Sequence, residues 1–252
     1  MKFFLKFIIL FFLIASTVHA NTCENEALLD SVLKQVNLKQ TLGSLKDCTV
    51  DPINNEQIIL AYAHWNAEEN DESEDVGNYT LYFFKINRKD LKLVYRFNVE
   101  NKLFSDALNL ENISLDTTHY KISENNRAIG LRLQYRVYSS VNPASMVLLN
   151  LYDFQNKKQI LENFIMISYH AETNGRCNAS VEENNLNLIM QSSKTNMNYD
   201  IQAVNKNVLY EGFETEEGCS ETDHQISLQK FLLKFDGTQY QLPHKYRKLF
   251  LY

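Results

Sequence analysis

The sequence predicts a mainly β protein, an antiparallel sandwich or a partly closed barrel with one N-terminal helix. From residue 57 onward, short runs of β-branched and aromatic residues alternate with Asn, Asp and Gly, which is typical of successive antiparallel strands. In one run, Leu131 to Val137, apolar residues occupy every second position, with Arg or Gln between them. This alternation predicts a strand with one buried and one solvated face.

The N-terminal helix is predicted for the segment before residue 37, where apolar residues recur at helical spacing behind an acidic start. The apolar positions are Ala27, Leu28, Val32, Leu33 and Val36, the acids are Glu24 and Glu26, and Gly43 lies beyond the expected end. We therefore expect an N-terminal helical segment over residues 21–48 and a single mainly β domain over residues 49–252.

Ten strands are expected in that domain, at 58–65, 79–86, 91–99, 128–138, 146–153, 160–168, 186–191, 198–204, 208–213 and 228–235. Two of the connections are good turn sequences. Asn87 to Asp90 separates two of the runs, and Asp236-Gly237 is a dipeptide favoured where both central residues of a hairpin turn need positive φ.

The first twenty residues predict a signal peptide. Lys2 and Lys6 precede an apolar run, and the sequence Val18-His19-Ala20 is a small-x-small cleavage site. The apolar run is broken at Lys6 and again after Ala15, so it falls short of the roughly 20 residues that a spanning helix needs. We expect a periplasmic protein, or alternatively a secreted one, without a membrane anchor once the leader is removed.

The mature chain is expected to be acidic. The full sequence has 25 basic and 31 acidic residues, a net charge of −6, and removal of two lysines with the leader changes it to −8. This balance argues against nucleic acids and anionic membranes as partners and favours a basic protein partner. No sequence pattern indicates a cofactor.

Four cysteines in an exported chain predict disulfides, because thiols are usually oxidised outside the cytoplasm. Three pairings are possible, and the nearest-neighbour pairing predicts bonds between Cys23 and Cys48 and between Cys177 and Cys219. No cysteine pair has the CxxC spacing and no histidine lies at ligand spacing from a cysteine, which excludes the usual zinc motifs.

The densest charged segment is a candidate site for a basic partner. It lies between two expected strands and consists of Glu68, Glu69, Asp71, Glu72, Glu74 and Asp75. Two alternatives stay open: a solvated hairpin loop, which is what a block of like charges usually is, and a calcium site, although the spacing is wrong for an EF-hand loop.

A second candidate surface is the strand at 128–138, where Arg132, Tyr135 and Arg136 could together bind a partner or a glycan. The alternative is an ordinary β surface. The sequence shows no nucleophile motif, and its histidines are scattered singly, so the catalytic residues are unknown and the pattern does not favour an enzyme. A pair of carboxylates that meets only in space stays open.

Three segments carry a resemblance. They are the stretch from Asn109 to Tyr120, the stretch from Arg127 to Arg132 followed by Ser140-Val141-Asn142-Pro143, and the ending Phe235-Asp236-Gly237-Thr238-Gln239-Tyr240. The chain resembles a family of exported proteobacterial proteins with the motifs L-x-L-D-T-x-x-Y, R-A-x-G-x-R and a terminal D-G-x-x-Y, over most of its length from about Cys48 to Tyr246. Where many members have Tyr-Asp-Leu, this chain has Tyr79-Thr80-Leu81. The resemblance implies a periplasmic location and a Gram-negative source, and it implies no activity.

Export, acidity and the missing catalytic motifs together favour a soluble, non-enzymatic periplasmic binding protein. An inhibitor or immunity-type factor for a toxin or an envelope enzyme is one form that it could take. Two alternatives stay open: a cell-envelope hydrolase, which would need a pocket lined by two carboxylates or by a histidine with an acid, and an envelope structural or stress protein.

Overall fold

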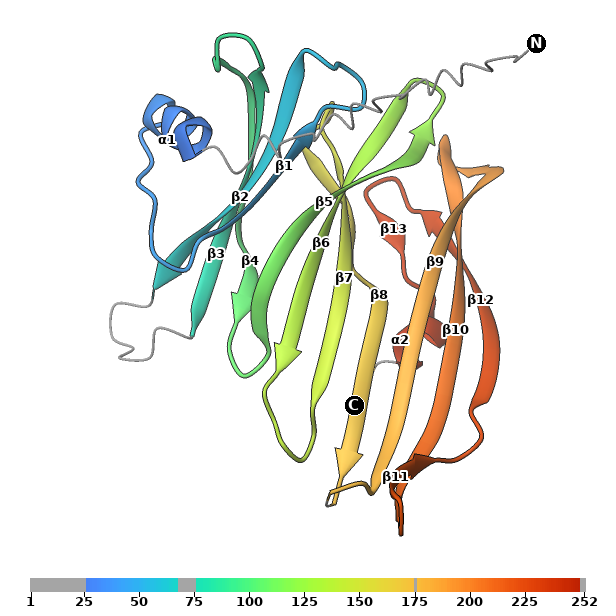
Figure 1. Ribbon diagram of the computed structural model, residues 1–252. Coiled ribbons are helices and arrows are strands. Elements are labelled where there is room, and N and C mark those ends of the chain that lie inside the picture. The colour runs from blue at the N-terminus through green and yellow to red at the C-terminus, as the bar shows by residue number, and fades with distance from the viewer. Residues whose placement is uncertain (1–25, 68–75, 175, 250–252) are drawn as a thin grey trace, which may run out of the picture.

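The computed structural model describes residues 26–67, 76–174 and 176–249 (Figure 1). It is mainly β, as predicted, with antiparallel sheets that do not close into a barrel and that pack as in a sandwich. Neither of the two described helices has the length and apolar character needed to cross a lipid bilayer. Residues 1–25, which include the predicted signal peptide and Cys23, and the acidic run at 68–75 lie outside the described residues.

The first sheet is a four-stranded meander with the order β1-β2-β3-β4. Its strands are β1 (Leu45–Val50), β2 (Gln57–Ala67), β3 (Gly77–Asn87) and β4 (Leu93–Ser105). The predicted helix is α1 (Glu26–Gln35), and it covers one face of this sheet (Figure 1). Leu28, Val32 and Leu33 of α1 are buried against Ile58, Leu60 and Phe84 of the sheet, which accounts for the helical spacing of the apolar residues.

The second sheet has the order β13-β12-β10-β9-β8-β7-β6-β5, and β11 also pairs with β10. Its strands are β5 (Asn109–Ser123), β6 (Asn126–Val137), β7 (Ala144–Asp153), β8 (Lys158–Thr173), β9 (Ala179–Thr195), β10 (Asn198–Thr215), β11 (Gly218–Glu221), β12 (Gln225–Phe235) and β13 (Tyr240–Gln241). The chain continues from β13 into a short helix, α2 (His244–Leu249).

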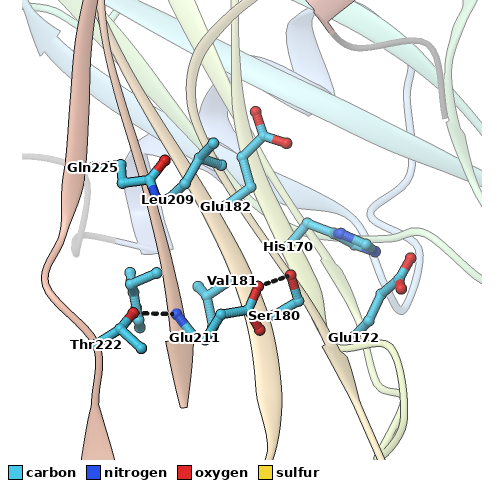
Figure 2. Close-up of a pocket in the computed structure, with 10 residues that line it drawn as sticks. His170, Glu172, Ser180, Val181, Glu182, Leu209, Glu211, Thr222 and Gln225 are labelled. Atoms are coloured by element: carbon cyan, nitrogen blue, oxygen red, sulfur yellow. Dashed lines mark hydrogen bonds between the residues drawn. The ribbon is translucent and has the colours of Figure 1, made fainter.

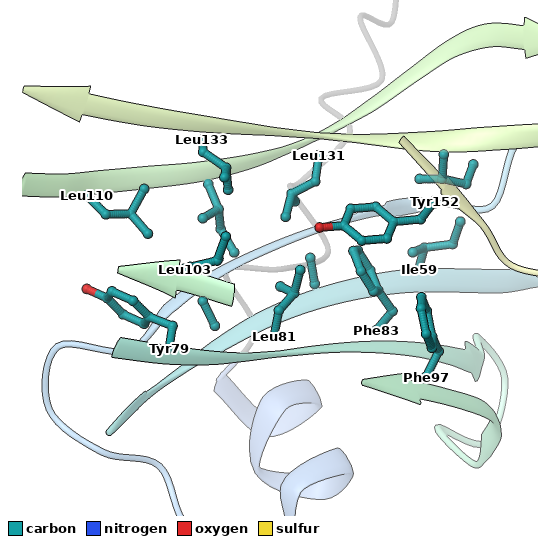
Figure 3. Packing of buried hydrophobic residues seen from close by; sticks show 14 of the residues in the cluster. Ile59, Tyr79, Leu81, Phe83, Phe97, Leu103, Leu110, Leu131, Leu133 and Tyr152 are labelled. Carbon is teal, nitrogen blue, oxygen red and sulfur yellow. The ribbon is translucent and has the colours of Figure 1, made fainter. Parts of the chain in front are cut away.

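The core has two main layers of apolar side chains. One lies between the first sheet and strands β5 to β7, where Leu81 and Phe83 face Leu131, Leu133 and Tyr152 (Figure 3). The other joins strands β5 to β8 to the upper parts of β9, β10 and β12 and to α2. Strands β5 to β8 are therefore a middle layer, whereas the lower ends of β8 to β12 extend beyond both core layers (Figure 1).

Several strands differ from the expected ones. The strand β5 is absent from the sequence-based set because bulges after Leu110, Asp116 and Lys121 interrupt its alternation. The strand β10 is continuous, although two strands, at 198–204 and 208–213, were expected there. It continues because the buried amides of Asn205 and Asn207 bond to the neighbouring strand β9. β1 was also not expected, and it crosses the expected segment boundary at residue 48.

The disulfide prediction is confirmed for one pair, because Cys177 and Cys219 are bonded to each other. This bond fits a chain that folds in an oxidising compartment. Cys48 is buried in β1 and is not a free thiol, while its predicted partner, Cys23, lies outside the described residues.

Candidate functional site

A polar hollow lies where the lower ends of β8, β9 and β10 meet an irregularity between β11 and β12. β11 ends opposite Gly212 and β12 begins opposite Leu209. Three residues, 222–224, therefore face only Tyr210 and Glu211, which is a β-bulge, a feature often found beside binding sites. The bulge is held by two hydrogen bonds: the N–H of Thr222 donates to the carbonyl of Glu211, and the N–H of Glu211 donates to Oγ1 of Thr222, both at 2.9 Å.

The hollow has a volume of about 350 Å³, which is near the lower limit for small-molecule sites. Strands β8, β9 and β10 each contribute a glutamate, namely Glu172, Glu182 and Glu211, and His170 lies beside Glu172 (Figure 2). Among the described residues, none of the three carboxylates forms an ion pair with a lysine or arginine. The hollow therefore presents carboxylates that no described lysine or arginine neutralises.

Two of the three carboxylates are held in place by hydrogen bonds. Oε1 of Glu182 accepts from Nδ2 of Asn207 at 2.8 Å and from Nδ2 of Asn184 at 3.2 Å. Oε1 of Glu211 accepts from Oγ of Ser180 at 3.0 Å (Figure 2). The acids are therefore partly preorganised, which lowers the entropic cost of binding a ligand.

A buried network of asparagines supports the hollow from the core side. Asn205 and Asn207 of β10 donate to Oδ1 of Asn184 in β9 at 2.8 and 3.1 Å, and Asn184 donates to Oγ of Ser168 in β8 at 3.3 Å. Asn184 is 1% exposed and Asn205 is fully buried. Such a network inside a sheet fixes the register of β8, β9 and β10, because a shift of one residue would leave the amides unpaired.

The chemistry of the hollow is that of a site for an organic cation. An ammonium or guanidinium group forms charge-assisted hydrogen bonds with carboxylates, and such bonds are the strong ones. In the part of the chain that the structure describes, no group of three His, Cys, Asp or Glu side chains is arranged to hold a metal ion.

The structure separates the three residues expected to form one partner surface on β6. Arg132 and Arg136 lie on the wetter face, but Tyr135 points the other way, is 6% exposed and belongs to the core between the sheets. The inclusion of Tyr135 in that surface was wrong, because alternation along a strand places residue 135 on the face opposite its even-numbered neighbours. Both arginines are also engaged, Arg132 with Asp116 at 2.7 Å and Arg136 with Glu111 at 3.2 Å.

Two of the three motifs that carry the resemblance meet in space at the bulge of β5 between Asp116 and Tyr120. Oδ2 of Asp116 accepts from the hydroxyl of Tyr120 and from Nε of Arg132, both at 2.9 Å. Arg127 donates to the carbonyls of Thr117 and Thr118 within the bulge. Gly130 lies opposite Asp116, and a Cβ added to Gly130 would be 2.8 Å from the Cβ of Asp116. These motif residues therefore hold a bulge together and leave Asp116 neutralised.

The terminal motif is structural as well. Oδ1 of Asp236 accepts from the N–H groups of Thr238 and Gln239 at 2.7 and 2.9 Å, and Gly237 has a φ of +106°. The buried Tyr240 donates to the carbonyl of Tyr199 at 2.7 Å. A turn is present at Asp236-Gly237 and joins β12 to β13, but only Gly237 of the two has the positive φ that was expected of both.

Comparison of the chain with protein-family models, with curated proteins and with solved structures gave no match.

Sequence reasoning did not single out the residues of the hollow. Glu172, Glu182 and Glu211 are separated by ten residues or more, and each looks like an ordinary solvated acid in its strand. The available signal was the pair Asn205 and Asn207 in the middle of an otherwise regular β pattern, because buried amides in a strand need partners on its neighbours.

Proposed function

We propose that this chain is an exported, non-enzymatic periplasmic protein that binds a basic partner protein, for example as an inhibitor or immunity-type factor. The observation that carries the proposal is the hollow with carboxylates from three neighbouring strands, none of which forms an ion pair with a described lysine or arginine. A lysine or arginine side chain of the partner would enter this hollow. The predicted signal sequence and the Cys177–Cys219 bond support the location, and the acidic net charge favours a basic partner.

The test is affinity capture from periplasmic extract with the immobilised mature chain at low salt, where electrostatic docking is strongest. The comparison is with a triple variant, Glu172→Gln, Glu182→Gln and Glu211→Gln, which removes the charge of the hollow. The matched control carries Glu56→Gln, Glu216→Gln and Glu217→Gln, three exposed acids outside the hollow.

The expected result is a basic protein that the wild type and the control retain and that the hollow variant loses. The same protein should elute as the salt concentration rises. Retention of no protein, or equal retention by all three baits, would contradict the proposal.

One observation favours a hydrolase as a second candidate: His170 lies in the same hollow as Glu172 and Glu182. Against it, Glu172 and Glu211 are exposed, whereas a carboxylic general acid needs burial to keep its proton near neutral pH. Incubation with purified cell-wall glycan and peptide separates the candidates. We expect no release of products, and release that is lost on substitution of His170→Ala would favour the hydrolase.

A further inference from the structure

The strand β12 has an open side. It pairs with β10 along one side, but on its other side only Lys234 and Phe235 pair with β13. Within the described residues, no strand pairs with the outer side of the segment from Gln225 to Leu233. An open edge of this length is a template for another strand, and proteins usually blunt or cover such edges.

The backbone groups that point outward from this edge follow from the neighbouring turn. The N–H of Asp236 donates to the carbonyl of Gln239 at 3.0 Å, on the side of β13. Backbone groups alternate between the two sides along an antiparallel strand. The groups of every second residue before Asp236 therefore point to the same side, away from β10. In the unpaired part of β12 these are the N–H and C=O groups of Leu232, Lys230, Leu228 and Ile226.

The side chains of the same four residues form an exposed row on the sheet face opposite the hollow. Ile226 is 59% exposed, Leu228 is 71% exposed and Leu232 is 41% exposed, which are high fractions for aliphatic residues in a strand. The fourth member of the row is the exposed Lys230, and two further exposed lysines lie on this face: Lys234 in β12 and Lys206, which lies opposite Leu228 in β10. No described carboxylate pairs with any of the three lysines.

We propose that the β12 edge, defined as the segment from Ile226 to Leu232, binds an extended segment of a partner protein as an additional strand. The outward N–H and C=O groups would supply main-chain hydrogen bonds, as in other cases of strand addition. The lysines, in a chain of net charge −6, select acidic side chains, and the aliphatic row selects apolar ones. The segment that fits best therefore has apolar residues opposite Ile226, Leu228 and Leu232 and an acidic residue opposite Lys230.

This surface is separate from the hollow. The hollow includes Leu209 and Gln225, which lie opposite each other and point to one face of the sheet. Ile226 and the other members of the row point to the other face, because neighbouring residues alternate. The two faces thus favour ligands of opposite charge, and binding at one can fail while binding at the other succeeds.

The probe is a seven-residue peptide with blocked ends and the sequence valine, threonine, glutamate, threonine, valine, threonine, valine. Paired antiparallel to β12, it would place its glutamate opposite Lys230 and its valines opposite Ile226, Leu228 and Leu232. One control peptide has lysine in place of the glutamate. The other has N-methyl groups on alternate amides, which remove hydrogen-bond donors along one side of the strand. Binding is followed by amide chemical shifts of the ¹⁵N-labelled mature chain.

Two variants test the two parts of the proposal. Lys230→Glu should lower the affinity for the glutamate peptide by about fivefold to tenfold and raise the affinity for the lysine peptide by a similar factor. Leu228→Pro removes one outward N–H without breaking a hydrogen bond to β10. It should lower the affinity for the glutamate peptide by about tenfold. Leu42→Asp, a change at an 85% exposed leucine far along the chain from β12, is the control that should leave binding unchanged.

The proposal is supported if the glutamate peptide shifts the amides of Ile226, Leu228 and Lys230, and if the charge exchange at Lys230 reverses the preference between peptides. It is overturned if none of these amides shifts at millimolar peptide, or if the N-methylated peptide binds equally well. It is also overturned if sedimentation shows a dimer that Leu228→Pro dissociates, because the edge would then be occupied by a second copy of the chain.

Discussion

Substitution of Asn184→Ala tests whether the buried amides hold the hollow in place. Asn184 is 1% exposed, and its Oδ1 is the acceptor for Nδ2 of Asn205, whose own Oδ1 has no hydrogen-bond partner among the described residues. The substitution leaves Nδ2 of Asn205 unpaired in a fully buried position, at a cost of about 1–3 kcal/mol. It also removes the bonds from Asn184 to Ser168 and Glu182, so the expected total loss is about 2–4 kcal/mol.

The assay is equilibrium unfolding in urea, followed by circular dichroism and by the fluorescence of Trp65, the single tryptophan, which is buried between the sheets. The midpoint should fall without a change in the dependence on denaturant, because the surface exposed on unfolding is nearly the same. The control is Asn185→Ala, the next residue, which is exposed on the opposite face and should change stability by less than about 0.5 kcal/mol.

The double variant Asn184→Ala with Asn205→Ala gives a sharper test. Removal of both amides leaves no orphaned donor from this pair, so the double variant should lose less stability than the sum of the single losses. Additive losses, or a loss below about 0.5 kcal/mol for Asn184→Ala alone, would refute the view that this network stabilises the lower ends of the strands.

The remaining predictions concern a bond, a charge and a close contact. Substitution of both Cys177 and Cys219 by Ala should cost about 4 kcal/mol in the chain-entropy model, because the bond joins residues 42 apart, and calorimetry of the variant measures the loss. Burial disfavours the charged form of Asp116, but hydrogen bonds from Thr118, Arg132 and Tyr120 outweigh it and lower the pKa of its carboxyl. The ionised carboxylate of Asp116 therefore contributes stability above its unfolded pKa, near 4, and this contribution is lost as pH falls through the lower folded pKa. Asp116→Asn should therefore make the free energy of unfolding fall less steeply as pH is lowered below about 4. An unchanged dependence on pH would contradict this. Gly130→Ala should lower the free energy of unfolding by about 1–3 kcal/mol, because the new Cβ would lie 2.8 Å from Cβ of Asp116. A urea midpoint equal to that of the wild type would show that the two strands move apart at no cost in stability.

The fold class, the N-terminal helix and most strands of this protein follow from the sequence by itself, because alternation and helical spacing record which side of each element is buried. The nearest-neighbour rule was also enough to pair Cys177 with Cys219. A bulge, such as the one after Asp116 in β5, shifts the alternation of apolar and polar residues by one position. The strand then cannot be recognised from that alternation in the sequence.

Only the tertiary structure decided which residues meet. Long-range pairing between strands brings Glu172, Glu182 and Glu211 into one hollow, whereas alternation within one strand takes Tyr135 away from Arg132 and Arg136. The most recognisable sequence motifs, those of Asp116, Gly130 and Asp236, belong to a bulge and a turn, because unusual backbone geometry restricts residue type tightly. A binding surface made of single residues from several strands imposes no local spacing, and for that reason the sequence does not reveal it.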